Sequence, residues 1–176
     1  MKTATYLRHA NAAIREALKE ARVFLKEINP VWDIELDPGY DFSGRFADAV
    51  AVYEHGSIYD DTIRIGINHM SSQQAIEDCF FADDTYQEKI EQIHAGNRQS
   101  VFHEMGHGIY EYLSDLYRDE AGYRKAIDDA GLQRLFTDDE EEHYVEQFAE
   151  DFDGYFPNEI NKAIEILGLV TEMKQI

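Results

Sequence analysis

The chain has 176 residues, of which 44% are hydrophobic, and this predicts one domain over residues 1–176 rather than two. Its 36 acidic and 16 basic side chains give a formal net charge of −20, which disfavours nucleic acid and anionic membranes as partners and favours basic ones. Cys79 is the single cysteine, so an internal disulfide and a multi-thiolate zinc site are excluded, and any metal must be held by histidines and carboxylates.

The first part of the chain is expected to form one long helix followed by strands. Apolar residues recur at helical spacing over residues 4–28, and Pro30 ends this pattern. The segment carries charges throughout and has no long apolar run, so we expect neither a signal peptide nor a membrane span, and a cytoplasmic protein. Between residues 31 and 68 three alternating runs, "VWDIELD", "ADAVAVYE" and "TIRIGIN", predict about three strands, the last two forming a hairpin.

Helical periodicity returns after residue 71. We expect a break at "AGN", where Asn97 would cap the next helix. The buried face of that helix is marked by apolar residues at steps of three or four: Phe102, Met105, Ile109, Tyr112 and Leu116. A short helix is expected near residues 120–130, and "TDDE" at residues 137–140 has the form of a capping box that opens another. The order of elements predicts an α+β fold with a small sheet packed on helices.

The segment "VFHEMGHGIYEY" places two histidines four residues apart inside an apolar helical pattern. Residues four apart on an α-helix differ by about 40° around its axis, so His103 and His107 project from one face and can share a metal ion. Glu104 is rotated by about 100° from His103. It can reach a water on that metal but is poorly placed to be a ligand, which suits a general base.

A catalytic zinc needs a third protein ligand and an open position. Glu146 lies 39 residues after His107, on the polar stripe of the helix that follows the capping box. Glu150, one turn later, could accept the free ring N–H of a ligating histidine. The sequence therefore predicts a zinc site made of His103, His107 and Glu146.

Two glycines flank the second histidine, although glycine inside a helix costs about 1 kcal/mol relative to alanine. Gly106 and Gly108 therefore indicate that another chain segment approaches the helix closely, as a sheet edge or a substrate strand would.

The pair of motifs "HEMGH" and "EQFAEDF" resembles the gluzincin zinc metallopeptidases, most closely the branch that contains anthrax lethal factor and the Pro-Pro endopeptidases. The resemblance covers mainly residues 97–156. It implies that His103, His107 and Glu146 ligate zinc, that Glu104 is the catalytic base and that Glu150 orients a histidine. The implied fold is a minimal zincin-like domain, in which a twisted sheet packs on an active-site helix and a glutamate helix.

The same resemblance implies that the edge strand of the sheet, drawn from residues 47–68, pairs with the backbone of a protein or peptide substrate above the zinc. The acidic surface adds the expectation that preferred substrates are basic.

One position departs from the family pattern. Its oxyanion-stabilising tyrosine usually lies seven residues before the ligating glutamate, where this chain has Asp139, which cannot donate a hydrogen bond when ionised. His143, one turn before Glu146, and Tyr144 are the candidate oxyanion donors by position.

Two other classes of function compete with the peptidase. The units Glu104-x-x-His107 and Glu140-x-x-His143 match the di-iron carboxylate proteins, whose four-helix bundle would leave the strand region without a role. The acidic composition also suits a non-catalytic interaction protein, such as a DNA mimic or an inhibitor on a zincin scaffold.

Overall fold

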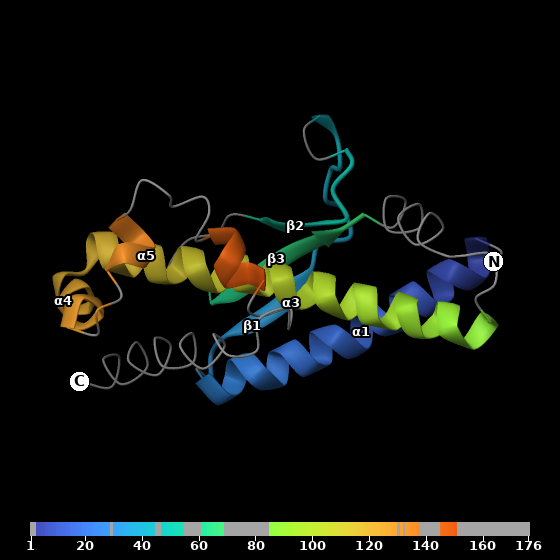
Figure 1. Cartoon of the computed structure of the whole chain (residues 1–176), viewed down its shortest axis with the longest axis horizontal. Coiled ribbons are helices and arrows are strands. Elements are labelled where there is room, and N and C mark those ends of the chain that lie inside the picture. The colour runs from blue at the N-terminus through green and yellow to red at the C-terminus, as the bar shows by residue number, and fades with distance from the viewer. Residues whose placement is uncertain are drawn as a thin grey trace.

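The computed structural model describes residues 3–28, 30–44, 47–54, 61–68, 85–129, 131, 133–137 and 145–150. Its helices and strands are shown in Figure 1: α1 (Thr3–Ile28), β1 (Asp33–Leu36), β2 (Ala51–Glu54), β3 (Thr62–Ile67), α3 (Tyr86–Asp119), α4 (Ala121–Asp129) and α5 (Arg134–Thr137). Residues 145–150 are also helical. The mixture of long helices and one small sheet confirms the expected α+β class. Over the described residues, every helix is too short or too polar to traverse a lipid bilayer.

The helices α1 and α3 pack side by side and run in the same direction (Figure 1). His94 approaches Glu16, and one turn further along both helices the Arg98 Nε donates to Glu20 over 2.9 Å. The apolar stripe of α1 is buried beside these polar contacts, with Ile14 and Leu25 almost inaccessible. The predicted N-terminal helix is thus confirmed, and it packs along one side of α3.

The three strands form one sheet in the order β1-β3-β2. β1 runs parallel to β3, while β2 pairs with β3 antiparallel, as the expected hairpin requires. Ile34 and Ile65 are fully buried within the core shared with the helices, whereas Arg64 and Glu35 form an exposed ion pair of 2.7 Å. This division into an apolar and a polar face follows from the alternation in the sequence.

The expected helix break at residues 95–97 is wrong, because α3 is continuous from Tyr86 to Asp119. Thr85 caps the helix through a capping box with Glu88, so Asn97 is not a cap. Instead Asn97 is buried within α3, and its side-chain Nδ2 donates to the carbonyl of Ile93 one turn back. Packing of this stretch against α1 outweighs the helix cost of about 1 kcal/mol at the neighbouring glycine.

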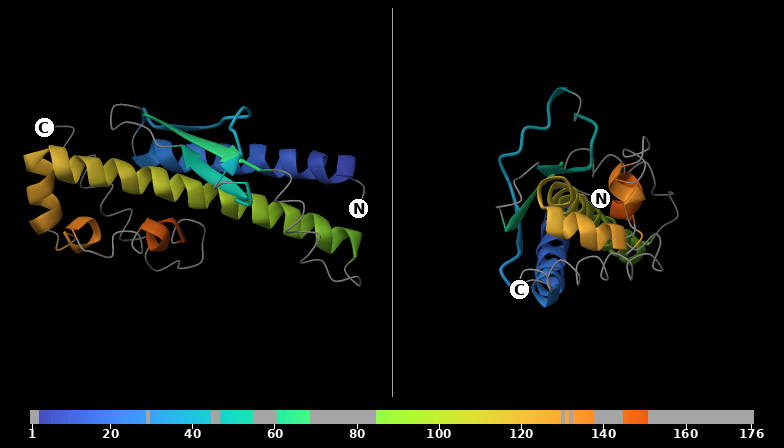
Figure 2. Two further views of the ribbon diagram at one scale, coloured as in Figure 1. Left: turned by 90° about the horizontal axis from the view of Figure 1, so that it is seen from above. Right: turned by 90° about the vertical axis from the view of Figure 1, so that its left-hand side faces the viewer.

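The sheet lies against α3 at Gly108, as the glycine pattern predicted. A Cβ added at Gly108 would lie 2.9 Å from Cγ2 of Ile63 on β3 and 3.1 Å from the Tyr53 ring on β2. Figure 2 shows the strands and α1 on different sides of α3, with the helix of residues 145–150 on a third side. Gly108 therefore sets how closely the sheet approaches the helix that carries both histidines.

Replacing Gly108 with alanine is expected to lower the free energy of unfolding by about 1–3 kcal/mol, because Ile63 and Tyr53 must both move to admit the methyl group. The matched control is Gly96→Ala on the same helix, where an added Cβ meets nothing within 4 Å and alanine should stabilise by up to about 1 kcal/mol. Urea unfolding of both variants measures the difference. Equal stabilisation by the two substitutions would contradict the close packing.

Candidate metal centre

His103 and His107 lie one turn apart on α3, and their side chains converge. The two Nε2 atoms are 3.1 Å apart, and the rings meet edge to face with centroids 4.7 Å apart. Both imidazoles are half-buried, with 23% and 15% of their side-chain surfaces exposed. Their backbone positions are fixed by the buried stripe on the other side of α3, which packs against α1.

Glu146 reaches the two histidines from the helical segment 145–150. One carboxylate oxygen lies 3.5 Å from Nε2 of His103, and the other lies 3.6 Å from Nε2 of His107. The Glu146 side chain is 62% exposed, so packing around this side chain does not hold it in place. The structure thus brings together the three residues that the sequence predicted, from segments far apart in the chain.

An aromatic cluster places the Glu146 segment against α3. Phe148, two residues after the glutamate, packs edge to face on Tyr110 with ring centroids 5.6 Å apart, and Ala149 is fully buried. Tyr110 also packs on Phe136 of α5, and its hydroxyl donates to the carbonyl oxygen of Leu135. The buried aromatic side of segment 145–150 therefore orients its polar side, and Glu146 with it, toward the histidines.

The spacing of the three side chains fits one tetrahedral metal ion. Two ligand atoms bound about 2.0–2.1 Å from such an ion are about 3.3–3.4 Å apart, close to the observed separations of 3.1, 3.5 and 3.6 Å. Among the described residues, His103, His107 and Glu146 form the one group of three potential ligands with this proximity. Two imidazoles and a carboxylate suit a divalent transition-series cation.

Glu104 is buried next to these ligands but points toward the sheet. Only 7% of its surface is exposed, and its carboxylate accepts a hydrogen bond from the backbone N–H of Tyr53 on β2. Burial, and then the negative charge of Glu146, raise the pKa of Glu104 from its ordinary 4.5 to about 8, while the Tyr53 bond opposes the rise. The folded chain therefore holds a proton on Glu104 to a higher pH than an exposed glutamate would.

Of the remaining predicted residues, only Glu150 lies in the described part of the chain. Glu150 is half-buried one turn after Glu146, and its role as an acceptor for a ligating histidine stays a prediction. His143 and Tyr144, the candidate oxyanion donors, and Asp139 lie outside the described residues.

Sequence reasoning missed the contribution of Tyr53. The group that approaches Glu104 is the backbone N–H of Tyr53. Every residue except proline has such an N–H, so the amino-acid sequence does not indicate this contact.

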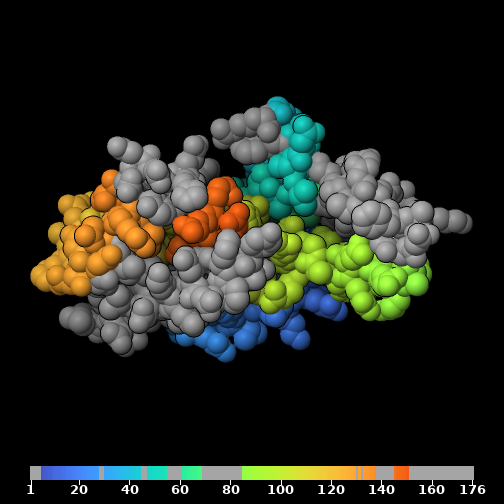
Figure 3. Space-filling model, viewed as in Figure 1, coloured from blue at the N-terminus to red at the C-terminus, as the bar shows by residue number. Residues whose placement is uncertain are grey.

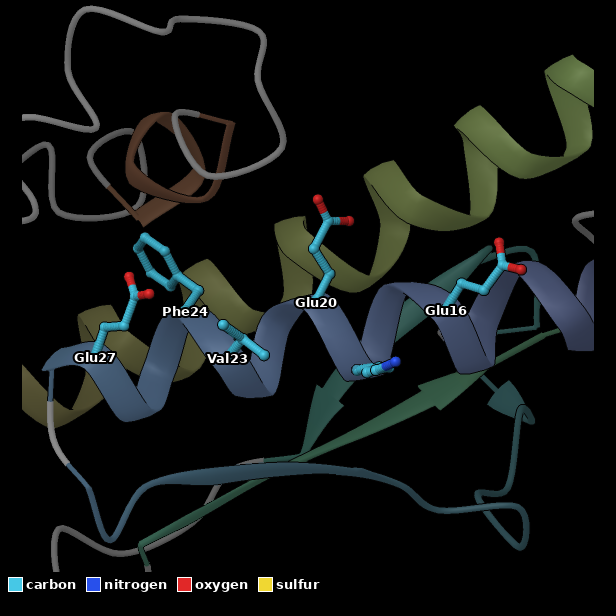
Figure 4. A pocket seen from close by; sticks show the side chains of 6 residues that line it. Glu16, Glu20, Val23, Phe24 and Glu27 are labelled. Carbon is cyan, nitrogen blue, oxygen red and sulfur yellow. The ribbon is translucent and has the colours of Figure 1, made fainter.

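The surface near the centre is shown in Figure 3, where the segment 145–150, in orange-red, and the residues of β2, in teal, appear on the same face above α3. A separate shallow hollow lies on α1, with Val23 and Phe24 between the carboxylates of Glu16, Glu20 and Glu27 (Figure 4). That hollow belongs to a helix that contributes no ligand to the centre.

Comparison with known proteins gives no support for a family assignment: no family model matches the sequence, and no curated protein or solved structure matches it either.

Proposed function

We propose that this chain is a zinc-dependent endopeptidase of the gluzincin type. The observation that carries the proposal is the convergence of His103, His107 and Glu146 within 3.1–3.6 Å of one another, with the buried Glu104 beside them. Three protein ligands that leave one coordination position free are the pattern of a catalytic rather than a structural zinc. The motif resemblance supports zinc over the other divalent cations that the same ligands could hold.

The chemistry of the site follows from its residues. Bound zinc would supply a polarised scissile carbonyl and a water molecule acidic enough to attack it near neutral pH. The Glu104 carboxylate accepts the proton that the water loses and then donates it to the nitrogen of the leaving amine. The Glu146 side chain is exposed, so a peptide can approach the centre from this side. We assign β2 to pairing with the substrate backbone, because it lies at the edge of the described sheet.

An acidic interaction protein that keeps the metal but lacks activity is the second candidate. It is favoured by Asp139, which stands where the family has its oxyanion-stabilising tyrosine, because losing such a donor can lower a rate by about 10²–10³-fold. Zinc without peptide cleavage, together with competition against DNA for a basic partner, would select it. The di-iron alternative fits less well, because a four-helix bundle has no place for the observed three-stranded sheet.

Purified protein is expected to contain one zinc per chain and to cleave peptides in a reaction that chelators stop and added zinc restores. Glu146→Ala should weaken zinc binding at least about 100-fold, because it leaves two ligands. The matched control is Glu27→Ala, which removes the same charge from the exposed surface of α1 and should bind zinc as the wild type does. Zinc titration against a fluorescent chelator gives both affinities. Two irons per chain, or equal zinc affinity in the two variants, would contradict the proposed centre.

A further inference from the structure

The outer edge of β2 presents its backbone groups next to the metal centre. The N–H of Asn68 donates to the carbonyl of Val50 over 2.8 Å, and Val52 and Glu54 continue the pairing opposite Gly66 and Arg64. Since alternate residues of an antiparallel strand face opposite ways, the N–H groups of Ala51 and Tyr53 point away from β3. Within the described part of the chain no strand pairs with this edge.

One of these two edge groups is aimed at Glu104. The N–H of Tyr53 donates to the Glu104 carboxylate, and the Tyr53 ring lies against α3 at Gly108, one turn after Glu104. The contact at Gly108 therefore fixes the distance between the edge of β2 and the carboxylate. Removing this hydrogen bond would leave a buried carboxylate oxygen without its donor, which costs free energy.

We propose that the backbone N–H of Tyr53, on the outer edge of β2, positions the Glu104 carboxylate for proton transfer. This inference rests on the proposed peptidase function, in which Glu104 is the base. The N–H is a positioning group, because it acts through Glu104 and touches neither the metal ligands nor the substrate. The edge of β2 would then serve two purposes. The Tyr53 N–H holds the Glu104 carboxylate, and the outward N–H of Ala51 is left for contacts with a substrate strand.

Amide exchange measured by NMR on the zinc-loaded, ¹⁵N-labelled protein tests the bond directly. The Tyr53 amide should exchange at least about tenfold more slowly than the Ala51 amide on the same edge, because a hydrogen-bonded amide exchanges only when the bond opens. Glu104→Ala should raise the Tyr53 rate at least about tenfold. Glu104→Gln, whose side-chain oxygen still accepts a hydrogen bond, should keep it slow. Amides of β3 report whether each variant stays folded.

The inference is overturned if Tyr53 exchanges as fast as Ala51 in the wild type, or if Glu104→Ala leaves the Tyr53 rate unchanged while β3 stays protected. Neither outcome depends on peptide cleavage. A wild type that binds zinc and never cleaves peptides would remove the proposed function, and the exchange rates would still decide whether Tyr53 holds Glu104.

A second arm separates positioning from folding. An amide-to-ester replacement at Tyr53 removes only the N–H and keeps the ring against Gly108. It should lower kcat by about 10–100-fold, as a misplaced base does, while KM and zinc content stay within about twofold. The same replacement at Asp48, in an exposed turn before β2, is the control and should leave kcat within about twofold. An unchanged kcat in the Tyr53 ester would overturn the inference.

Discussion

Replacing Glu104 with glutamine is expected to lower peptide hydrolysis by at least about 10²–10⁴-fold while zinc stays bound. Glutamine has the same shape and can accept the hydrogen bond from Tyr53, but it cannot take a proton from water. The three metal ligands are untouched, so zinc affinity should change by less than about tenfold. Single-turnover cleavage of a fluorogenic peptide, with zinc content measured on the same sample, checks both parts.

The control for this prediction is Glu91→Gln, an exposed glutamate on α3 three turns before the site. It makes the same chemical change on the same helix, and its activity should match that of the wild type. Full activity in Glu104→Gln would remove the proposed base. Loss of zinc together with activity would show that Glu104 supports the metal site rather than the proton transfer.

The helices and strands were largely predictable because their burial follows from periodicity. The stripe through Met105 and Ile109 repeats every three or four residues, and these side chains are buried where α3 meets α1. The alternating run "TIRIGIN" became the central strand of the sheet, with Ile65 in the core. Where one face of an element is consistently apolar, local sequence and tertiary packing favour the same structure.

The continuity of α3 could not be predicted, because local signals there oppose the tertiary structure. Gly96 and Asn97 weaken a helix in isolation. In the folded protein the Asn97 amide finds its acceptor on Ile93 inside the helix, and the hydroxyl of Ser100 donates back to the carbonyl of Gly96. Packing of Val101 in the core then favours a single long helix.

The ligands of the candidate site were predictable as residue types and spacings, but the way they are brought together was not. The motif fixes His103 and His107 relative to each other on α3, whereas Glu146 depends on Phe148 packing against Tyr110. The hydrogen bond from the Tyr110 hydroxyl to the carbonyl of Leu135 joins α5 to the same cluster, and no sequence pattern encodes that contact.

The metal-free protein is expected to lose stability as the pH rises from about 5 to about 8. Glu104 has a pKa of about 8 in the folded chain and an ordinary value of 4.5, so the folded state binds its proton more tightly than the unfolded state does. Between these values the folded state holds more protons, and the free energy of unfolding therefore falls with increasing pH. The stabilisation is complete below about 4.5 and is lost as the pH passes through 8. The full shift corresponds to a change on the order of 5 kcal/mol.

Urea unfolding in the presence of a chelator, from pH 5 to pH 8.5, measures this dependence. Glu104→Gln keeps the side chain neutral at every pH, so the stability of the wild type minus that of the variant should fall by about 4 kcal/mol over the range. Taking this difference separates Glu104 from His103 and His107, which are present in both proteins. Parallel stability curves would show that Glu104 ionises in the folded chain as it does in water.

Zinc should reduce this pH dependence. A cation held by Glu146 offsets the negative charge that helps to raise the pKa of Glu104, and its own positive charge favours the ionised carboxylate. The wild type and Glu104→Gln should therefore differ less in slope when both are saturated with zinc. Metal binding would then convert Glu104 from a protonated acid at pH 7 into the carboxylate that the proposed reaction requires.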